Sequence, residues 1–173
     1  SVIACGEEID LHAGVTSQPD YEGELAVVIG QRGTNIAEED AWDYIFGYTI
    51  INDVTARDLQ KRHSQWLLGK SLDTFCPMGP YILVGNHAPQ YFEVQTCING
   101  ELRQSGKTED LIFSIPNLIA TISSGITLEP GDIISTGTPK GVGMGFRPPR
   151  FLQSGDEIAI TISSIGTLEN TVK

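Results

Sequence analysis

The chain has 173 residues, of which 40% are hydrophobic and 19% are charged. This composition suits one compact domain with a sizeable core and excludes a mainly disordered chain. The 22 acidic residues outnumber the 11 basic ones and leave a formal net charge of -11 at pH 7. Because a phosphate backbone or an anionic membrane would repel such a protein, we expect neither nucleic acid nor a membrane as its partner.

Short segments rich in Ile, Val and Thr, separated by Gly, Pro, Asn or Asp, predict a mainly β (α+β) fold. Within one of them, Val94, Thr96 and Ile98 alternate with polar residues and lead into Asn99-Gly100. Asn-Gly is the dipeptide most typical of a two-residue hairpin turn, so we expect a hairpin there. In chain order, the predicted strands cover residues 24–30, 45–53, 79–85, 92–100, 132–138 and 156–166.

Helices are expected to be few and short. The segment 37–44 carries acidic residues in its first turn, where they complement the helix dipole. A second helix is predicted over 116–123, because Pro116 suits a first helical turn and Gly125 follows its end. A third, shorter helix is expected to begin soon after Asp53.

The domain organisation is predicted to be simple. No linker-like stretch divides the chain, so residues 1–173 are interpreted as one domain, and no apolar run approaches the roughly 20 residues of a membrane span. Cys5, Cys76 and Cys97 are odd in number and widely spaced, without a C-x-x-C pair. Free thiols of this kind fit a reducing compartment, so we expect the protein in the cytoplasm.

Acidic residues stand at the ends of two predicted strands. Glu22 and Glu24 flank Gly23, and the two-residue period of a strand places both carboxylates on one face. Taken alone, the pair is more typical of a solvated strand edge. Asp53, however, closes the apolar run 45–51. Three carboxylates at strand ends would suit a hard cation that prefers oxygen ligands, such as Mg²⁺ or Mn²⁺, and disfavour zinc.

Further candidate residues follow the third carboxylate. Arg57 and Gln60 lie four and seven positions after Asp53, on one face if this stretch is helical. Arg57 suits bidentate recognition of a carboxylate, although a surface arginine bridging to Asp58 or Glu39 is an alternative. Lys70 could orient a water molecule or stabilise an enolate beside a metal, or remain solvated.

A loop rich in Gly and Thr, residues 136–143, comes after a strand and overlaps the end of the predicted segment 132–138. It has no P-loop pattern. Its backbone amides and the hydroxyl of Thr138 could bind an oxyanion or form a tight turn.

Several motifs occur along the chain in a fixed order: YEGELAVVIG, GYTIINDVTARDLQ, QWLLGKSLDTFCPMGP, LIFSIPNLI and LEPGDIISTGTPKGVG. They resemble those of the fumarylacetoacetate hydrolase family, especially its short bacterial-type members. The resemblance covers nearly all 173 residues and implies a mixed β-roll, commonly a homodimer, that binds Mg²⁺ or Mn²⁺, with Ca²⁺ as a substitute. Such members include acylpyruvases, oxaloacetate decarboxylases and isomerases of homoprotocatechuate degradation.

The resemblance also implies roles for individual residues. The metal carboxylates of the family correspond to Glu22, Glu24 and Asp53, and Thr74 would lie near the metal. The family's substrate contacts correspond to Arg57, Gln60 and Thr138, and its lysine corresponds to Lys70, the expected catalytic residue.

One family feature does not match. Members usually carry an upstream lid segment whose His and Glu activate water, and this sequence begins after that point. Either this sequence is a piece of a longer protein, or it lacks the usual general base. In the second case we expect decarboxylation, which needs mainly an electron sink, rather than hydrolysis.

We expect an enzyme that cleaves C–C bonds of short 2-oxo or 1,3-diketo acids through a metal-stabilised enolate, either by acylpyruvate hydrolysis or by decarboxylation of the oxaloacetate type. Two alternatives remain. One is a 2-hydroxyhepta-2,4-diene-1,7-dioate isomerase or decarboxylase of aromatic catabolism. The other is a domain that binds metal and acid without turnover.

Overall fold

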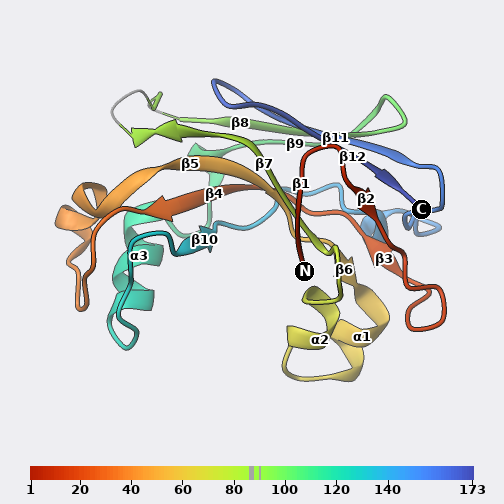
Figure 1. The fold of residues 1–173 in the computed structure, drawn as a ribbon, viewed down its shortest axis with the longest axis horizontal. Coiled ribbons are helices and arrows are strands. Elements are labelled where there is room, and N and C mark those ends of the chain that lie inside the picture. Colours follow the sequence, from red (N-terminus) through yellow and green to blue (C-terminus); the bar gives the residue numbers. More distant parts are fainter. Residues whose placement is uncertain (86–87, 90) are drawn as a thin grey trace.

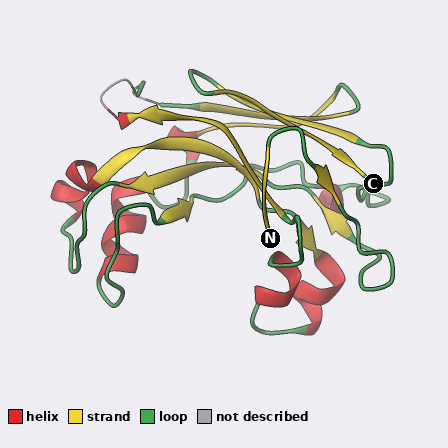
Figure 2. Ribbon diagram, viewed as in Figure 1, coloured by secondary structure: helices red, strands yellow, loops and turns green. Residues whose placement is uncertain are grey.

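Two stacked β-sheets and a few short helices build the fold. The structure is a computed structural model that describes residues 1–173 except 86, 87 and 90. Figure 1 shows the sheet that contains β8, β9, β11 and β12 above the sheet that contains β4, β5 and β10. Figure 2 shows that strands and loops make up most of the chain. The prediction of a mainly β fold is confirmed.

The first sheet is mixed and contains the strand that begins at Gly23. Across the sheet the order is β1 (Val2–Ala4), β7 (Cys76–Val84), β5 (Ile45–Asn52), β4 (Gly23–Ile29) and β10 (Ile133–Ser135). The adjacent strands β4 and β5 pair antiparallel, with Gly23 opposite Asn52 and Glu24 opposite Ile51. At the edges, β1 runs parallel to β7, and β10 runs antiparallel to β4.

The second sheet contains the predicted hairpin. Asn99 and Gly100 both have positive φ, 51° and 76°, as a two-residue turn of type I′ requires. The order across this sheet is β2 (Glu8–Ile9), β12 (Gly166–Val172), β11 (Glu157–Ile162), β8 (Glu93–Ile98) and β9 (Glu101–Lys107). A third, two-stranded sheet pairs β3 (Pro19–Asp20) with β6 (Thr55–Ala56).

The three predicted helices are confirmed. The first is the 3-10 helix η1 (Glu38–Tyr44), and the second is α3 (Ile115–Ser123), whose N-cap Ser114 accepts a hydrogen bond from the backbone N–H of Asn117. The third is α1 (Arg57–Arg62), followed by the unpredicted α2 (Leu67–Lys70). Single 3-10 turns are η3 (Thr108–Asp110) and η4 (Gly143–Gly145).

The hydrophobic core joins the two sheets. Leu25, Val27 and Ile29 of β4 are almost completely buried, and they belong to one core together with Ile160 of β11. Gly23 continues this row: a Cβ atom there would lie 2.3 Å from Oγ1 of Thr96 on β8. Because side chains alternate along a strand, the neighbours of Gly23 face away from the second sheet.

Two predicted strands differ from the structure. One strand over 156–166 is wrong, because β11 ends at Ile162 and β12 begins at Gly166. Between these two strands the chain reverses at Ser164, which has a φ of 67°. The sequence did not indicate this turn, because Ser-Ser is a weak turn signal within an apolar, β-branched stretch. The predicted strand 132–138 is shorter in the structure, where β10 covers only Ile133–Ser135. After it, the side-chain hydroxyls of Thr136 and Thr138 donate to carbonyl oxygens of β4.

Within the described part of the chain, no helix is both long and apolar enough to cross a membrane.

Candidate metal centre

The register of β4 and β5 brings three acids together. The backbone N–H of Asp53 donates to the carbonyl oxygen of Glu22 at 2.9 Å, which extends the ladder one residue beyond the paired strands. One carboxylate oxygen each from Glu22, Glu24 and Asp53 can be chosen so that all three lie within 4.8 Å of one another. These three side chains form the carboxylate cluster. The alternative of a solvated strand edge is wrong, because Glu22 and Glu24 are buried.

Glu24 is the most deeply buried member. Its Oε2 accepts hydrogen bonds from the backbone N–H of Gly137, at 2.8 Å, and from the hydroxyl of Ser135. Burial nevertheless raises the pKa of Glu24 to about 7, and the nearby charges of Asp53 and Glu22 act in the same direction. Near neutral pH this carboxyl is therefore partly protonated in the metal-free protein.

Lys70 joins the other two carboxylates. It ends α2, and its Nζ lies 2.6 Å from Oε2 of Glu22 and 2.5 Å from Oδ2 of Asp53. Burial lowers the pKa of Lys70, but these two carboxylates outweigh it, so the pKa lies above its ordinary value. Burial raises the pKa of Asp53, and the Lys70 ammonium opposes that rise. Lys70 is therefore a cation at neutral pH and cannot serve as a base.

Arg57 is the first residue of α1, and its side chain is buried. Its Nε donates to Oδ2 of Asp20 at 2.9 Å, and its Nη1 lies 2.7 Å from Oε1 of Glu22. The surface alternative, with Arg57 bridging to Asp58 or Glu39, is wrong: Arg57 is 3% exposed and contacts two other acids. Its Nη2 is also buried and has no hydrogen-bond partner among the described residues. One donor beside the cluster is thus left for a ligand.

The charges around the cluster fit a divalent cation. Four carboxylates, those of the cluster and of Asp20, lie within a network that includes two cations, Arg57 and Lys70. With every group ionised the network has a net charge of -2. The clustered ligand atoms are all carboxylate oxygens, the type that Mg²⁺ and Mn²⁺ prefer. The residues present therefore fit such an ion in both charge and chemistry.

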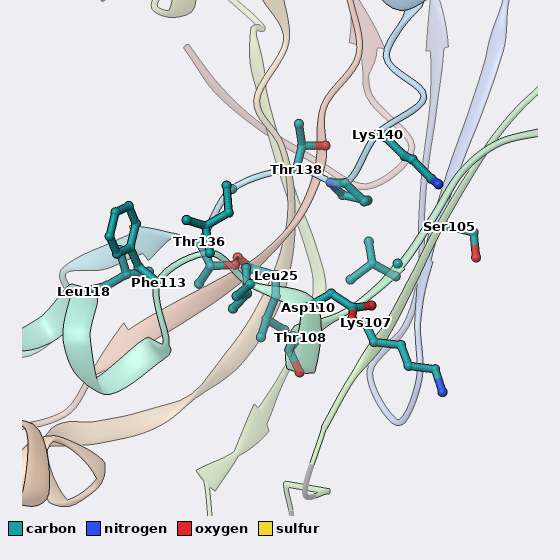
Figure 3. A pocket seen from close by; sticks show the side chains of 16 residues that line it. Leu25, Ser105, Lys107, Thr108, Asp110, Phe113, Leu118, Thr136, Thr138 and Lys140 are labelled. Carbon is teal, nitrogen blue, oxygen red and sulfur yellow. Dashed lines mark hydrogen bonds between the residues drawn. The ribbon is translucent and has the colours of Figure 1, made fainter.

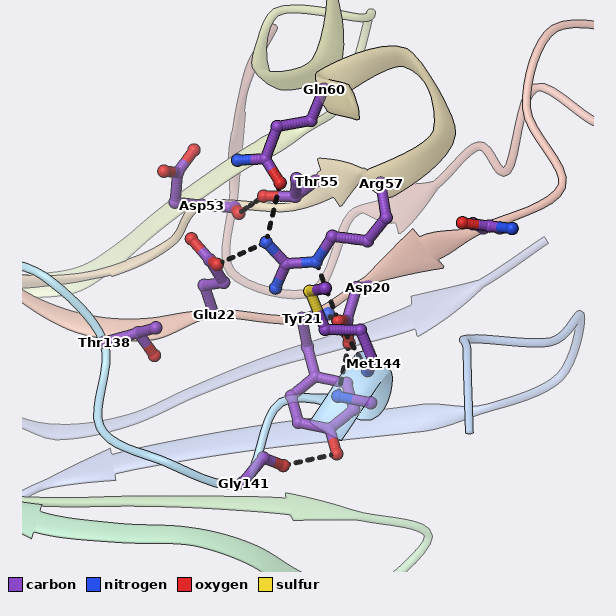
Figure 4. Close-up of polar contacts among 12 residues, drawn as sticks. Asp20, Tyr21, Glu22, Asp53, Thr55, Arg57, Gln60, Thr138, Gly141 and Met144 are labelled. Atoms are coloured by element: carbon purple, nitrogen blue, oxygen red, sulfur yellow. Dashed lines mark hydrogen bonds and ion pairs between the residues drawn. The ribbon is translucent and has the colours of Figure 1, made fainter. Parts of the chain in front are cut away.

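Gln60 lies beside Arg57, as the predicted helical spacing requires. Its Oε1 accepts a hydrogen bond of 3.3 Å from Nη1 of Arg57. Figure 4 shows its amide nitrogen on the side of Asp53.

The two predicted threonines have different surroundings. The hydroxyl of Thr138 donates to the carbonyl oxygen of Gly23 at 3.0 Å and accepts from Nε2 of Gln104 at 2.7 Å. To donate to a substrate acid, Thr138 would have to release Gly23. The Thr74 hydroxyl accepts from the backbone N–H of Asp10 at 2.9 Å, and its place near a metal stays a prediction.

Two buried polar residues escaped the sequence analysis. Asp20 is completely buried and shares the two-residue spacing of Glu22 and Glu24, a signal that was present in the sequence. Gln104, also completely buried, crosses from β9 to the first sheet, where its Oε1 accepts from the backbone N–H of Gly23 at 3.1 Å. No local pattern marks Gln104, because its partners lie more than 30 positions away in the sequence.

The loop rich in Gly and Thr uses its amides as predicted, but on anions of the protein itself. Gly137 donates to Glu24, while Gly143 and Met144 donate to Asp20 at 2.6 and 3.0 Å. A Cβ atom on Gly143 would lie 2.6 Å from Oδ1 of Asp20, so only glycine permits this approach.

A cavity of about 550 Å³ is lined by the loop rich in Gly and Thr and by β9. Gly137 and Thr138 line it, whereas Glu22, Glu24 and Asp53 do not. Figure 3 shows the apolar side chains of Phe113 and Leu118 on one side of the cavity and Lys140 on the other. The cavity is connected to the carboxylate cluster through Gly137, whose backbone N–H donates to Glu24.

Comparisons with known proteins agree with the motifs. Residues 1–173 match the family described as fumarylacetoacetate (FAA) hydrolase, C-terminal. Oxaloacetate tautomerase YisK of Bacillus subtilis is 62% identical over 174 residues, which cover 99% of this chain and 58% of that protein. The chain thus spans little more than half the length of this relative.

Solved structures show the same fold. A fumarylacetoacetate hydrolase from psychrophilic Exiguobacterium antarcticum is 50% identical with a TM-score of 0.97, covering 100% of this chain and 63% of that one. Fumarylpyruvate hydrolase from Pseudomonas aeruginosa, in complex with Mn²⁺ and pyruvate, is 30% identical with a TM-score of 0.89, covering 99% of this chain and 73% of that one.

Proposed function

Because the chain belongs to the fumarylacetoacetate hydrolase family, we propose that it is an enzyme acting on oxaloacetate or a related short 2-oxo acid through the enolate form. The carboxylate cluster would hold Mg²⁺ or Mn²⁺, with Ca²⁺ as a substitute. The observation that carries this proposal is the buried network, of charge -2 when every group is ionised, beside Nη2 of Arg57, which has no hydrogen-bond partner among the described residues. Such a network suits a divalent cation and an organic acid together.

Each residue has a role that its contacts support. Glu22, Glu24 and Asp53 would hold a divalent ion, which would supply Lewis-acid polarisation of the 2-oxo group. Arg57 binds the substrate carboxylate through Nη2, and Gln60 holds the guanidinium in place by accepting a hydrogen bond from Nη1. Lys70, kept protonated by its two acidic neighbours, stabilises negative charge that develops on the substrate oxygen.

Oxaloacetate is the first substrate to test because the relative with 62% identity is named an oxaloacetate tautomerase. Keto–enol interconversion and decarboxylation both pass through the enolate, so the same residues support either outcome. Hydrolysis of an acylpyruvate is the second candidate, favoured by the fold shared with fumarylpyruvate hydrolase.

The test is an assay of the purified protein with Mg²⁺ or Mn²⁺ against oxaloacetate, acetylpyruvate, fumarylpyruvate and 2-hydroxyhepta-2,4-diene-1,7-dioate. Loss of enol absorbance from oxaloacetate without pyruvate would indicate a tautomerase, and release of pyruvate would indicate a decarboxylase. Cleavage of the acylpyruvates would indicate a hydrolase, and conversion of the dienedioate would indicate an isomerase.

Replacing one ligand provides the control. Glu24→Gln keeps the size of the side chain and should reduce activity by more than the roughly 100-fold that loss of an outer partner causes. Glu129→Gln, at an exposed carboxylate paired with Arg32, should leave activity unchanged. Metal binding without turnover of any of the four acids would instead support the binding-only alternative.

We also propose that residues 1–173 act as one catalytic domain, and that the protein assembles as a homodimer in the cytoplasm. Two consecutive apolar side chains, Ile112 and Phe113, are 92% and 61% exposed, which supports an association surface. Light scattering after size exclusion should give twice the mass of the chain. A monomer at micromolar concentration would contradict the dimer.

A further inference from the structure

We propose that Asp20 is a positioning residue that fixes the Arg57 guanidinium and couples it to the loop carrying Thr138. This inference rests on the proposed function, in which Arg57 binds the substrate acid. The carboxylate of Asp20 belongs neither to the carboxylate cluster nor to the substrate contacts inferred from the family resemblance. Its role follows from what surrounds it (Figure 4).

Four N–H donors converge on the two oxygens of Asp20. Oδ1 accepts from the backbone N–H groups of Tyr21 and Gly143, at 3.0 and 2.6 Å. Oδ2 accepts from the backbone N–H of Met144, at 3.0 Å, and from Nε of Arg57, at 2.9 Å. The carboxylate is completely buried, so water does not compete for these donors.

Only a carboxylate can satisfy all four donors. An amide of the same shape has one acceptor oxygen, and its NH₂ group would face two N–H donors in either orientation. With the amide nitrogen at the Oδ2 position, Arg57 and Met144 would lose their acceptor, and with the amide flipped, Tyr21 and Gly143 would lose theirs. Asparagine would therefore disturb this site without changing its size.

The bond to Asp20 holds Nε of the guanidinium, which does not contact the carboxylate cluster. Nη1 contacts Glu22 and Gln60, and Nε contacts Asp20, so the guanidinium plane is held from two sides. Nη2 is the remaining donor, and its direction follows from the other two. Asp20 thus determines where the free N–H of Arg57 points.

The same carboxylate ties Arg57 to the loop that follows Thr138. Residues 143 and 144 bind Asp20, and the hydroxyl of Tyr21 donates to the carbonyl oxygen of Gly141 at 2.9 Å. Arg57 and this loop are far apart in the sequence, and Asp20 contacts both. It therefore ties Arg57 to the segment that follows Thr138.

The test compares Asp20→Asn with Tyr21→Phe. The second variant removes another anchor of the same loop, at Gly141, but does not touch Arg57. For the acid that the wild type turns over, Asp20→Asn should raise KM between about tenfold and 100-fold, because a misdirected guanidinium weakens carboxylate binding. Tyr21→Phe should leave KM nearly unchanged, and kcat should change less than KM in both variants.

A measurement that does not need turnover completes the test. In ¹⁵N NMR spectra, the Nε–H of Arg57, assigned by its loss in Arg57→Lys, should exchange slowly in the wild type and in Tyr21→Phe. In Asp20→Asn it should exchange at least about tenfold faster, because its acceptor is gone. Binding of oxalate, measured by calorimetry with Mn²⁺ present, should weaken only in Asp20→Asn.

The outcomes separate this proposal from the proposed function. An inactive wild type in which the Nε–H of Arg57 still depends on Asp20 would contradict the proposed function and support the positioning role. An active wild type with equal effects of Asp20→Asn and Tyr21→Phe on KM would overturn the positioning role. If Asp20→Asn does not fold, the wild type alone decides. Fast exchange of the Arg57 Nε–H with solvent would overturn the positioning role, and slow exchange would support it.

Discussion

Glu24 shows how burial changes an acid. It is 4% exposed, and its two hydrogen-bond donors, Ser135 and Gly137, do not compensate for the loss of water. Its pKa therefore rises from 4.5 to about 7. The proton stays on this carboxyl across a pH range in which an exposed glutamate is ionised.

The pH dependence of stability follows from this shift. Between about pH 4.5 and 7 the folded state binds the Glu24 proton and the unfolded state does not, so the metal-free protein should lose stability as pH rises through this window. The full difference corresponds to at most about 3 kcal/mol. Urea unfolding of the metal-free protein at several pH values measures it.

Glu24→Gln is the matched variant for this measurement. Because glutamine does not titrate, the fall in stability between pH 4.5 and 7 should become much smaller, and the metal-free variant should be more stable than the wild type at pH 8. An unchanged pH profile would mean that Glu24 does not carry the shifted pKa.

At the scale of residues, the sequence revealed groups whose spacing is local. Glu22 and Glu24 were recognisable from the strand period, and Arg57 and Gln60 from the helical period. Gln104 has no such mark, because its partners are set by the packing of β9 against the first sheet. Its role needed the three-dimensional structure.

At the scale of elements, β4 connects the core with the site. Gly23 faces β8 while its neighbours carry the carboxylates, so the distance between the sheets at this point depends on a residue without a side chain. Thr96 and Ile160 fill the space that a Cβ atom would need. The core and the cluster are therefore fixed by the same strand.

Gly23→Ala should destabilise the protein by about 2 kcal/mol or more, because the added Cβ would lie 2.3 Å from Oγ1 of Thr96. Thr96→Ala removes that oxygen, so the double variant should recover part of the loss in a double-mutant cycle from urea unfolding. Strictly additive effects would show that the two residues do not compete for space.

The elements that could be predicted are those with strong local signals. The hairpin was marked by Asn99-Gly100, and α3 by Pro116. The short strands β1, β2, β3 and β6 have two or three residues each, too few for a periodic pattern, and they exist because neighbouring segments supply hydrogen-bond partners. Their positions are consequences of tertiary structure.

At the scale of the whole molecule, the negative charge favours cation binding. The chain has a net charge of -11, and the network around the carboxylate cluster has a charge of -2 when fully ionised. A bound divalent cation would neutralise that network and displace the Glu24 proton. Metal binding and proton release should therefore be coupled.

Mg²⁺ or Mn²⁺ should raise the melting temperature, because an ion that binds only the folded state stabilises it by about 4 kcal/mol at 1,000 times its Kd. The rise should be larger at pH 8 than at pH 6, since protons compete for Glu24 below its pKa of about 7. Thermal unfolding at both pH values measures this. Equal rises at pH 6 and 8, or equal rises in wild type and Glu24→Gln, would contradict the site.

The alternation along residues 20–24 has a consequence for how this segment can evolve. Asp20, Glu22 and Glu24 bind donors of the site, whereas Tyr21 and Gly23 contact the loop at Gly141 and the second sheet. Inserting or deleting one residue here would exchange the two sets and place carboxylates against Thr96 and Ile160. The length of this segment therefore cannot change by a single residue without loss of both the site and the core.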